Sequence, residues 1–87
     1  MKIKDIRYVK TNETRTDGRY PLRIGSTVDF YLNIKPVMGD VMCLSYILDN
    51  QGNEKEGILR TSLVMNVTET EREIIVETVN SIYYLEK

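Results

Sequence analysis

The chain has 87 residues, no histidine, one cysteine and a net charge of −1. It therefore lacks the commonest general base and metal ligand, and a single thiol cannot hold a disulfide scaffold together. The near-neutral charge favours neither a polyanion nor a membrane as partner. The length suits one domain, residues 1–87, and no apolar run is long enough for a signal peptide or a membrane span, so we expect a cytoplasmic protein.

The first predicted element is a strand over residues 2–10. Ile3 and Ile6 fall on opposite parities, which indicates a bulge or a late start of the strand. The next stretch, from Thr11 to Arg23, has no hydrophobic periodicity. We expect a loop without regular structure there, and a loop of that length in a small domain is more often functional than a short turn.

Period-two alternation predicts the second strand, over residues 27–34. Its apolar residues share one parity and most of its polar residues share the other, as in a half-buried strand. Pro36 follows and ends the element. The residues that we expect to face the core are Val28, Phe30, Leu32 and Ile34.

A run that is apolar on both faces, residues 41–48, predicts a central strand. The Asp-Asn-Gln-Gly-Asn sequence after it predicts a hairpin loop, because Asn and Gly tolerate the positive φ of such turns. We expect Cys43 to be a buried core residue of this strand. Three methionines are expected to fill the core in the same way, namely Met38, Met42 and Met65.

The C-terminal third predicts further strands, with a return from residue 56 to residue 68 and a charged turn over residues 69–72. A run dense in β-branched residues, 73–79, follows the turn. Residues 82–85 end the chain as a short strand. The Asn80-Ser81 pair between these last two strands is compatible with either a tight turn or a bulge.

Together these elements predict an all-β fold with little helix. Five to seven short antiparallel strands must wrap to bury both faces of the central strand, so we expect a small, partly open barrel or roll of the SH3-like or OB-like kind. A two-layer sandwich is the alternative. Because a partly open barrel leaves edges to protect, a homodimer formed by edge-strand pairing is also compatible with the sequence.

No catalytic, cofactor-binding or metal-binding constellation is present in the sequence. The five glycines are isolated, so no phosphate-binding loop occurs. The acidic residues Glu69, Glu71 and Glu73 surround a turn that also holds Arg72, and we interpret them as a solvated loop. We therefore expect a non-enzymatic binding module without cofactors. A small enzyme or enzyme subunit is the least favoured alternative.

Charge and tyrosine content point to a candidate binding surface near the N-terminus. Residues 1–25 carry seven basic and three acidic side chains, a net +4, while the rest of the chain carries a net −5. Another protein is the expected partner; the alternative is single-stranded nucleic acid, with phosphates on the arginines and bases stacked on tyrosines. The candidate residues are Arg7, Arg15, Arg19, Tyr20, Arg23 and Tyr31.

The sequence over residues 59–64 and 74–85 resembles an ending of short proteins from Gram-positive and gut bacteria and their prophages. The shared pattern is Thr-x-Asn-Ser-x-Tyr-x-Leu. The resemblance implies a compact β-fold and a phage or mobile-element accessory factor, and it implies no activity, cofactor or catalytic residue. The residues that carry the pattern here are Thr78, Asn80, Ser81, Tyr83 and Leu85.

Overall fold

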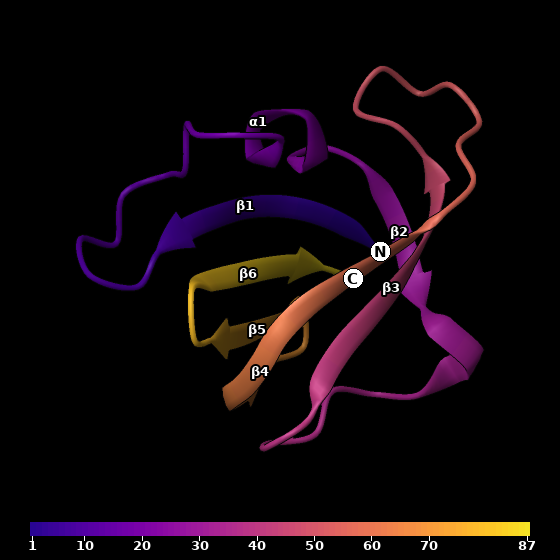
Figure 1. Cartoon of the computed structure of the whole chain (residues 1–87). Helices are drawn as coiled ribbons and strands as arrows, with labels where there is room; N and C mark the ends of the chain where they lie inside the picture. Colours follow the sequence, from indigo (N-terminus) through magenta and orange to yellow (C-terminus); the bar gives the residue numbers. More distant parts are fainter.

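The computed structural model describes all 87 residues and is an all-β fold of six antiparallel strands (Figure 1). Each strand is bonded to its neighbours in chain order, and the last returns to the first, so the sheet closes into a ring. This confirms the predicted small, partly open barrel. The strands are β1 (Lys2–Tyr8), β2 (Thr27–Phe30), β3 (Val41–Leu48), β4 (Ile58–Glu69), β5 (Glu73–Thr78) and β6 (Ser81–Glu86).

Helical structure is confined to one turn of α-helix, α1 (Tyr20–Arg23), and one 3₁₀ turn, η1 (Tyr31–Asn33). This agrees with the absence of a 3.6-residue apolar stripe in the sequence. No helix in the structure has the length and apolar character needed to cross a membrane.

The ring is weakest between β1 and β2, where a single residue pair, Lys2 with Thr27, is in register. Backbone hydrogen bonds at the N-terminus complete the closure: the Ile3 amide donates to Ser26 O (2.9 Å) and the Gly25 amide donates to Ile3 O (2.7 Å). Gly25 has φ +92°, a conformation that favours glycine. The other pairs of neighbouring strands share longer ladders.

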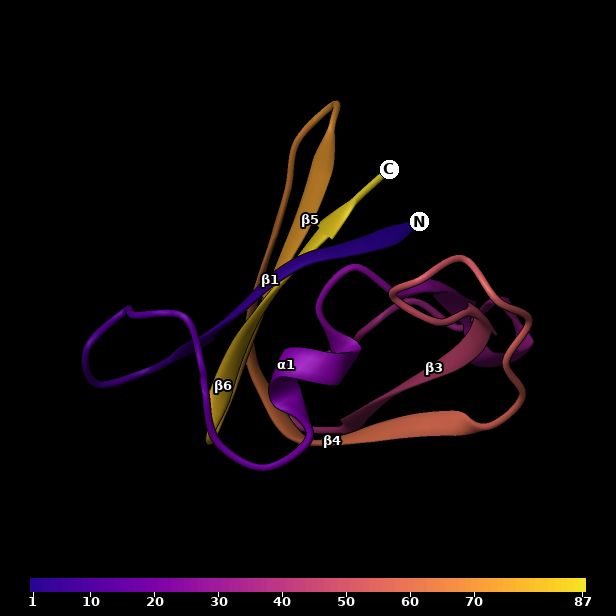
Figure 2. The same ribbon diagram turned by 90° about the horizontal axis from the view of Figure 1, so that it is seen from above.

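The long strand β4 belongs to both halves of the ring. Its first half pairs with β3 through residues 58–63, and its second half pairs with β5 through residues 64–69. Figure 2 shows the consequence, with β1, β5 and β6 crossing β3 and the start of β4 at a steep angle. β4 makes this bend at two register shifts, one on each side of Val64.

These shifts explain why one predicted core residue is exposed. Before the bend Leu59 and Thr61 point inward, whereas after it Val64 does. The Thr61 hydroxyl accepts a hydrogen bond from the Met42 amide (3.0 Å), which fixes the first shift. Met65 therefore points outward with 52% of its surface exposed, so the prediction that it fills the core is wrong.

Eleven apolar residues form the core inside the ring. The bulge predicted in β1 is confirmed: the register with β6 shifts between Ile3 and Asp5, and both Ile3 and Ile6 are fully buried. Burying side chains of this size contributes about 1.5–3 kcal/mol each. The core residues are Ile3, Ile6, Val28, Met42, Leu44, Leu59, Val64, Ile74, Val76, Tyr83 and Leu85.

The second strand is shorter than its alternation predicts. β2 ends at Phe30, and the next residues form η1, in which Leu32 and Asn33 have positive φ (53° and 57°). Leu32 and Ile34 are exposed instead of buried. The prediction of one strand through Ile34 is therefore wrong. Positive φ is incompatible with extended pairing, so the chain leaves the sheet here.

The central strand is confirmed, since β3 spans Val41–Leu48 and lies between β2 and β4. Met42 and Leu44 are buried, but Cys43 is only half-buried on the other face, so its assignment to the core is wrong. The hairpin loop after β3 is also confirmed. The Asp49 carboxylate accepts the amides of Gln51 and Asn53 at 2.9 Å each and so shapes the turn.

The pair Asn80-Ser81 marks a turn and not a bulge, because β5 ends at Thr78 and β6 begins at Ser81. The buried Thr78 hydroxyl accepts the Ser81 amide (3.1 Å) and donates to Ser81 O (2.9 Å). Side-chain hydrogen bonds therefore hold this turn, as the sequence indicated.

Candidate functional site

The segment between β1 and β2 folds back on the ring. The Tyr8 amide donates to Glu13 O (2.9 Å), and the Arg15 amide donates to Ile6 O (2.8 Å). The segment ends in α1, where Pro21 occupies the first turn. The prediction of a loop without regular structure from Thr11 to Arg23 is therefore wrong for its last four residues, and its first part is held against β1.

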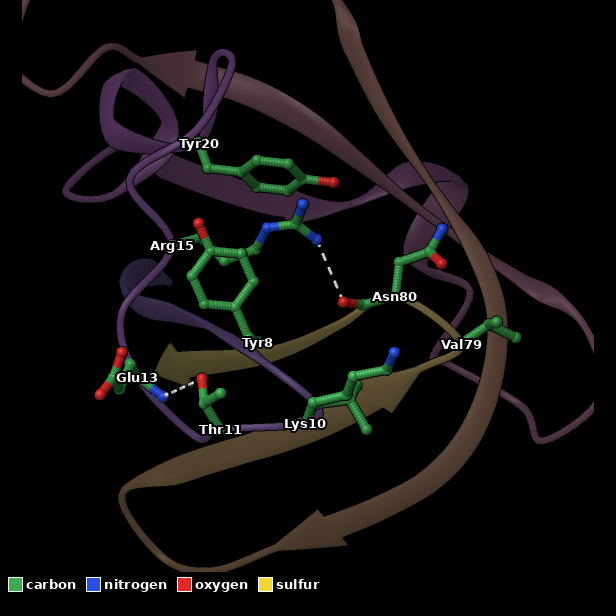
Figure 3. Close-up of a pocket in the computed structure, with 9 residues that line it drawn as sticks. Tyr8, Lys10, Thr11, Glu13, Arg15, Tyr20, Val79 and Asn80 are labelled. Carbon is green, nitrogen blue, oxygen red and sulfur yellow. Dashed lines mark hydrogen bonds between the residues drawn. The ribbon is translucent and has the colours of Figure 1, made fainter.

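Arg15 is the centre of this segment (Figure 3). Its guanidinium donates to the Ser81 hydroxyl (2.7 Å) and to Asn80 O (3.1 Å), and it forms an ion pair with Asp17 (2.7 Å). It also lies over the ring of Tyr20, 3.9 Å from the centroid. Only 13% of the side chain is exposed. These contacts leave Arg15 little capacity to bind a ligand.

The same contacts shift the pKa values of two side chains in this segment, Asp17 and Arg15. Hydrogen bonds from Arg15, and secondarily from the Tyr8 hydroxyl, lower the pKa of Asp17 to about 2. The bond to Asp17 in turn raises the pKa of Arg15. Burial raises the pKa of Tyr83, which lies inside the ring near Tyr20, to about 12. At neutral pH the ion pair is therefore fully formed and Tyr83 is neutral.

The largest cleft, of about 600 Å³, opens beside Arg15 between β1 and the turn that joins β5 to β6. The free charges in its wall are those of Lys10 and Glu13, which form no ion pair. No group of three His, Cys, Asp or Glu side chains in the structure is arranged to hold a metal ion. The cleft thus provides a concave surface with one unpaired positive charge and one unpaired negative charge.

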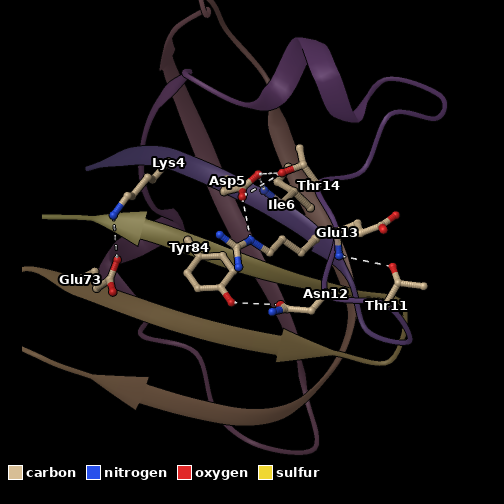
Figure 4. Close-up of polar contacts among 10 residues, drawn as sticks. Lys4, Asp5, Ile6, Thr11, Asn12, Glu13, Thr14, Glu73 and Tyr84 are labelled. Carbon is tan, nitrogen blue, oxygen red and sulfur yellow. Dashed lines mark hydrogen bonds and ion pairs between the residues drawn. The ribbon is translucent and has the colours of Figure 1, made fainter.

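Arg7 belongs to another cluster, which also holds Asp5 on β1 and Tyr84 on β6, both labelled in Figure 4. Its Nε donates to the Asp5 carboxylate (2.8 Å), which also accepts the Thr14 hydroxyl (3.0 Å). The guanidinium lies 4.6 Å from the ring centroid of Tyr84. The hydrogen bond that Arg7 donates to Asp5 raises the pKa of Arg7. The Arg7 guanidinium is therefore also engaged in contacts within the protein.

The sixth candidate, Tyr31, lies at the other end of β2 from α1. Its ring lines a small pocket of about 180 Å³, together with Ile34, Pro36 and the start of β3. The structure thus brings Arg15, Tyr20 and Arg23 together and separates them from Arg7 and from Tyr31. The six candidate residues do not form one surface.

A second groove, of about 520 Å³, lies between α1 and the start of β4, and we call it the basic groove. Two of its cations, Arg19 and Arg23, were candidates from the sequence. Two others, Lys55 and Arg60, come from the part of the chain with net negative charge and were missed. None of the four forms an ion pair. The groove is lined by Arg19, Leu22, Arg23, Tyr46, Lys55, Glu56, Gly57, Ile58, Leu59 and Arg60.

A third surface is the connection between β2 and β3, residues 31–40, which we call the apolar arm. Four of its side chains are more than half exposed: Leu32 (72%), Ile34 (62%), Val37 (60%) and Met38 (63%). Met38 was predicted to fill the core, and that prediction is wrong. The arm follows the point where β2 leaves the sheet, so its side chains have no layer to pack against.

Comparison with known proteins finds no matching family model, no similar curated protein and no similar solved structure. The resemblance to bacterial and prophage proteins stays a prediction.

Proposed function

We propose that this chain is a non-enzymatic protein-binding module whose main contact surface is the apolar arm. The observation that carries the proposal is the exposure of Ile34, Val37 and Met38 on one short connection. Single exposed apolar residues are normal on a protein surface, but an exposed cluster typically marks a contact site.

The arm continues onto β4. The Gly39 amide donates to Val64 O (2.8 Å), and the Val64 amide donates to Asp40 O (2.7 Å). These bonds join the arm to β4 one residue after Met38 and one residue before Met65. Both methionine side chains are exposed, so apolar side chains continue from the arm onto the sheet. Unbranched, polarizable thioethers suit a surface that adapts to a partner.

The arm is held in place before any partner binds. Besides the bonds to Val64, Lys35 forms an ion pair with Glu69 (3.8 Å), and the Asp40 carboxylate accepts the Val41 amide (2.8 Å). A surface that is already ordered loses less conformational entropy on binding, which favours affinity.

The nucleic-acid alternative requires that bases stack on exposed tyrosine rings. In the structure, arginine side chains already lie over several of these rings. Arg7 lies over Tyr84, Arg15 over both Tyr8 and Tyr20, and Arg23 also lies near Tyr20 (5.0 Å). These intramolecular contacts compete with stacking of a base on the same rings. They favour a protein partner over single-stranded nucleic acid.

The proposal is tested with two matched variants, Met38→Ser in the arm and Ile47→Ser at the far end of β3. Both side chains are exposed, so neither substitution should unfold the protein. Each protein is immobilised and used to isolate a partner from a lysate of the source organism, and the affinity is then measured with the purified partner. We expect Met38→Ser to weaken binding by about tenfold or more and Ile47→Ser to leave it unchanged. Failure to retain any protein, or equal loss in both variants, would overturn the proposal.

A further inference from the structure

The first half of β4 has a strand neighbour on one side only. Residues 58–63 pair with β3, but β5 joins β4 only from Val64 onward. No backbone hydrogen bond links residues 58–62 to any segment other than β3. The outer edge of this half-strand therefore presents amide and carbonyl groups without a backbone partner, which are a template for another extended chain. The exception is Ser62 O, which accepts the Thr61 hydroxyl (2.8 Å).

The basic groove runs along this free edge. Arg60 and Ile58 project outward from the edge strand itself, while Arg19 and Leu22 come from the α1 side. Ion pairs within the protein engage five of its twelve cations, and four of the remaining seven line this one groove. One carboxylate, Glu56, also lines the groove, so the four cations leave it a net charge of +3, which suits an anion.

Apolar side chains lie between the cations. Leu22 is 61% exposed and Ile58 is 52% exposed in the wall of the groove. On the inner side the Tyr46 ring is covered by Lys55, whose Nζ lies 4.1 Å from the ring centroid. A ligand that matches this surface carries carboxylates and apolar side chains along an extended backbone.

We propose that the free edge of β4 takes up an extended acidic segment of a partner protein as an added strand. Its backbone pairs with residues 58–62, its carboxylates lie against Arg19 and Arg60, and its apolar side chains contact Leu22 and Ile58. This site is separate from the apolar arm and goes beyond the proposed function. It stands even if the arm binds nothing.

Two other occupants fit this groove less well, one because of its charge and the other because of its bases. A second copy of this chain paired through the same edge brings two Arg60 side chains and their neighbouring cations together, and like charges at an interface are repulsive. A single-stranded nucleic acid provides anions, but its bases need open aromatic faces, and the ring in this groove, Tyr46, is covered by Lys55.

The test measures fluorescence anisotropy with a short labelled peptide of alternating Glu and Val. Three competitors are added in parallel: the same peptide with Lys in place of Glu, the Glu-Val peptide with alternate amides N-methylated, and oligothymidylate. The unlabelled Glu-Val peptide is added as a fourth competitor. The expected result is that the labelled Glu-Val peptide binds and that only the unlabelled, unmethylated Glu-Val peptide competes. N-methylation removes the backbone donors that an added strand needs.

Two charge-matched pairs of substitutions locate the site. Arg19→Gln with Arg60→Gln removes two cations from the groove, and Lys2→Gln with Lys10→Gln removes two unpaired cations elsewhere. The groove pair should weaken peptide binding by about tenfold or more and the control pair by less than about twofold. Circular dichroism confirms that each variant is folded. Equal loss in both pairs, undiminished competition by the methylated peptide, or tighter binding of oligothymidylate would each overturn the proposal.

Discussion

The guanidinium of Arg15 lies over the ring of Tyr20, 3.9 Å from its centroid, while donating at 2.7 Å to the hydroxyl of Ser81. One side chain thus joins the segment after β1, the helical turn α1 and the hairpin of β5 and β6. Arg15 was a candidate ligand-binding residue from the sequence. Its contacts make it a stabilising residue instead.

Arg15→Gln should lower the free energy of unfolding by about 2–3 kcal/mol, because it removes a cation–π contact and hydrogen bonds from a charged donor. Arg19→Gln, which removes an exposed cation with no ion pair, should change that energy by less than about 0.5 kcal/mol. Urea denaturation measures both. Equal stability of the two variants would contradict the role given to Arg15.

Asp17 makes the stability depend on acid pH. Its pKa is about 2 in the folded protein, against an ordinary value near 3.9 in an unfolded chain. A lowered pKa contributes stability that is complete above about pH 4 and is lost as the pH falls through about 2. The stability difference between the wild type and Asp17→Asn should therefore shrink from pH 5 to pH 2. A difference that stays constant over this range would show that the Arg15 ion pair contributes nothing.

Thr78 should be essential to the last hairpin. Thr78→Val removes both hydrogen bonds to Ser81 and leaves a buried amide unpaired, which costs about 2–3 kcal/mol. Thr68→Val, an exposed substitution on β4, should change the stability by less than about 0.5 kcal/mol. Thermal unfolding followed by circular dichroism compares them, and similar melting temperatures would contradict this account of the turn.

Substitutions of a buried and of an exposed methionine should differ in their effect on the free energy of unfolding. Met42→Ala should cost about 2–5 kcal/mol because its side chain is 1% exposed inside the ring. Met38→Ala and Met65→Ala should each change the stability by less than about 0.5 kcal/mol. Urea denaturation of the three variants gives the comparison. A large decrease in the free energy of unfolding of Met38→Ala would mean that the apolar arm packs against the core.

The sequence predicts the elements whose pattern depends on local chemistry. Val41–Leu48 is apolar on both faces and bounded by turn residues, so β3 is found with its correct ends. The bulge near Ile3 is visible in the parity of two isoleucines. In contrast, alternation past Phe30 shows only which side chains would share a face. It does not show whether the ring has room to bury them, and Leu32 and Ile34 are left outside.

The binding surfaces depend on distances that no local pattern contains. Arg15 bonds to Ser81, 66 residues later in the chain. Lys55 and Arg60 lie in an acidic part of the sequence, so a count of charge along the chain cannot place them beside Arg19. The outward parity of Arg60 with Ile58 was a usable signal. The position of α1 across the groove from the start of β4 has no such signal in the sequence.

Protein binding through the apolar arm is tested most directly by photo-crosslinking in living cells. A benzophenone amino acid replaces Met38 in one variant and Ile47 in another, and irradiated cells are examined for adducts heavier than the 10.1 kDa chain. We expect a discrete adduct from position 38 and none from position 47. No adduct from position 38, or the same adducts from both positions, would contradict the proposed function.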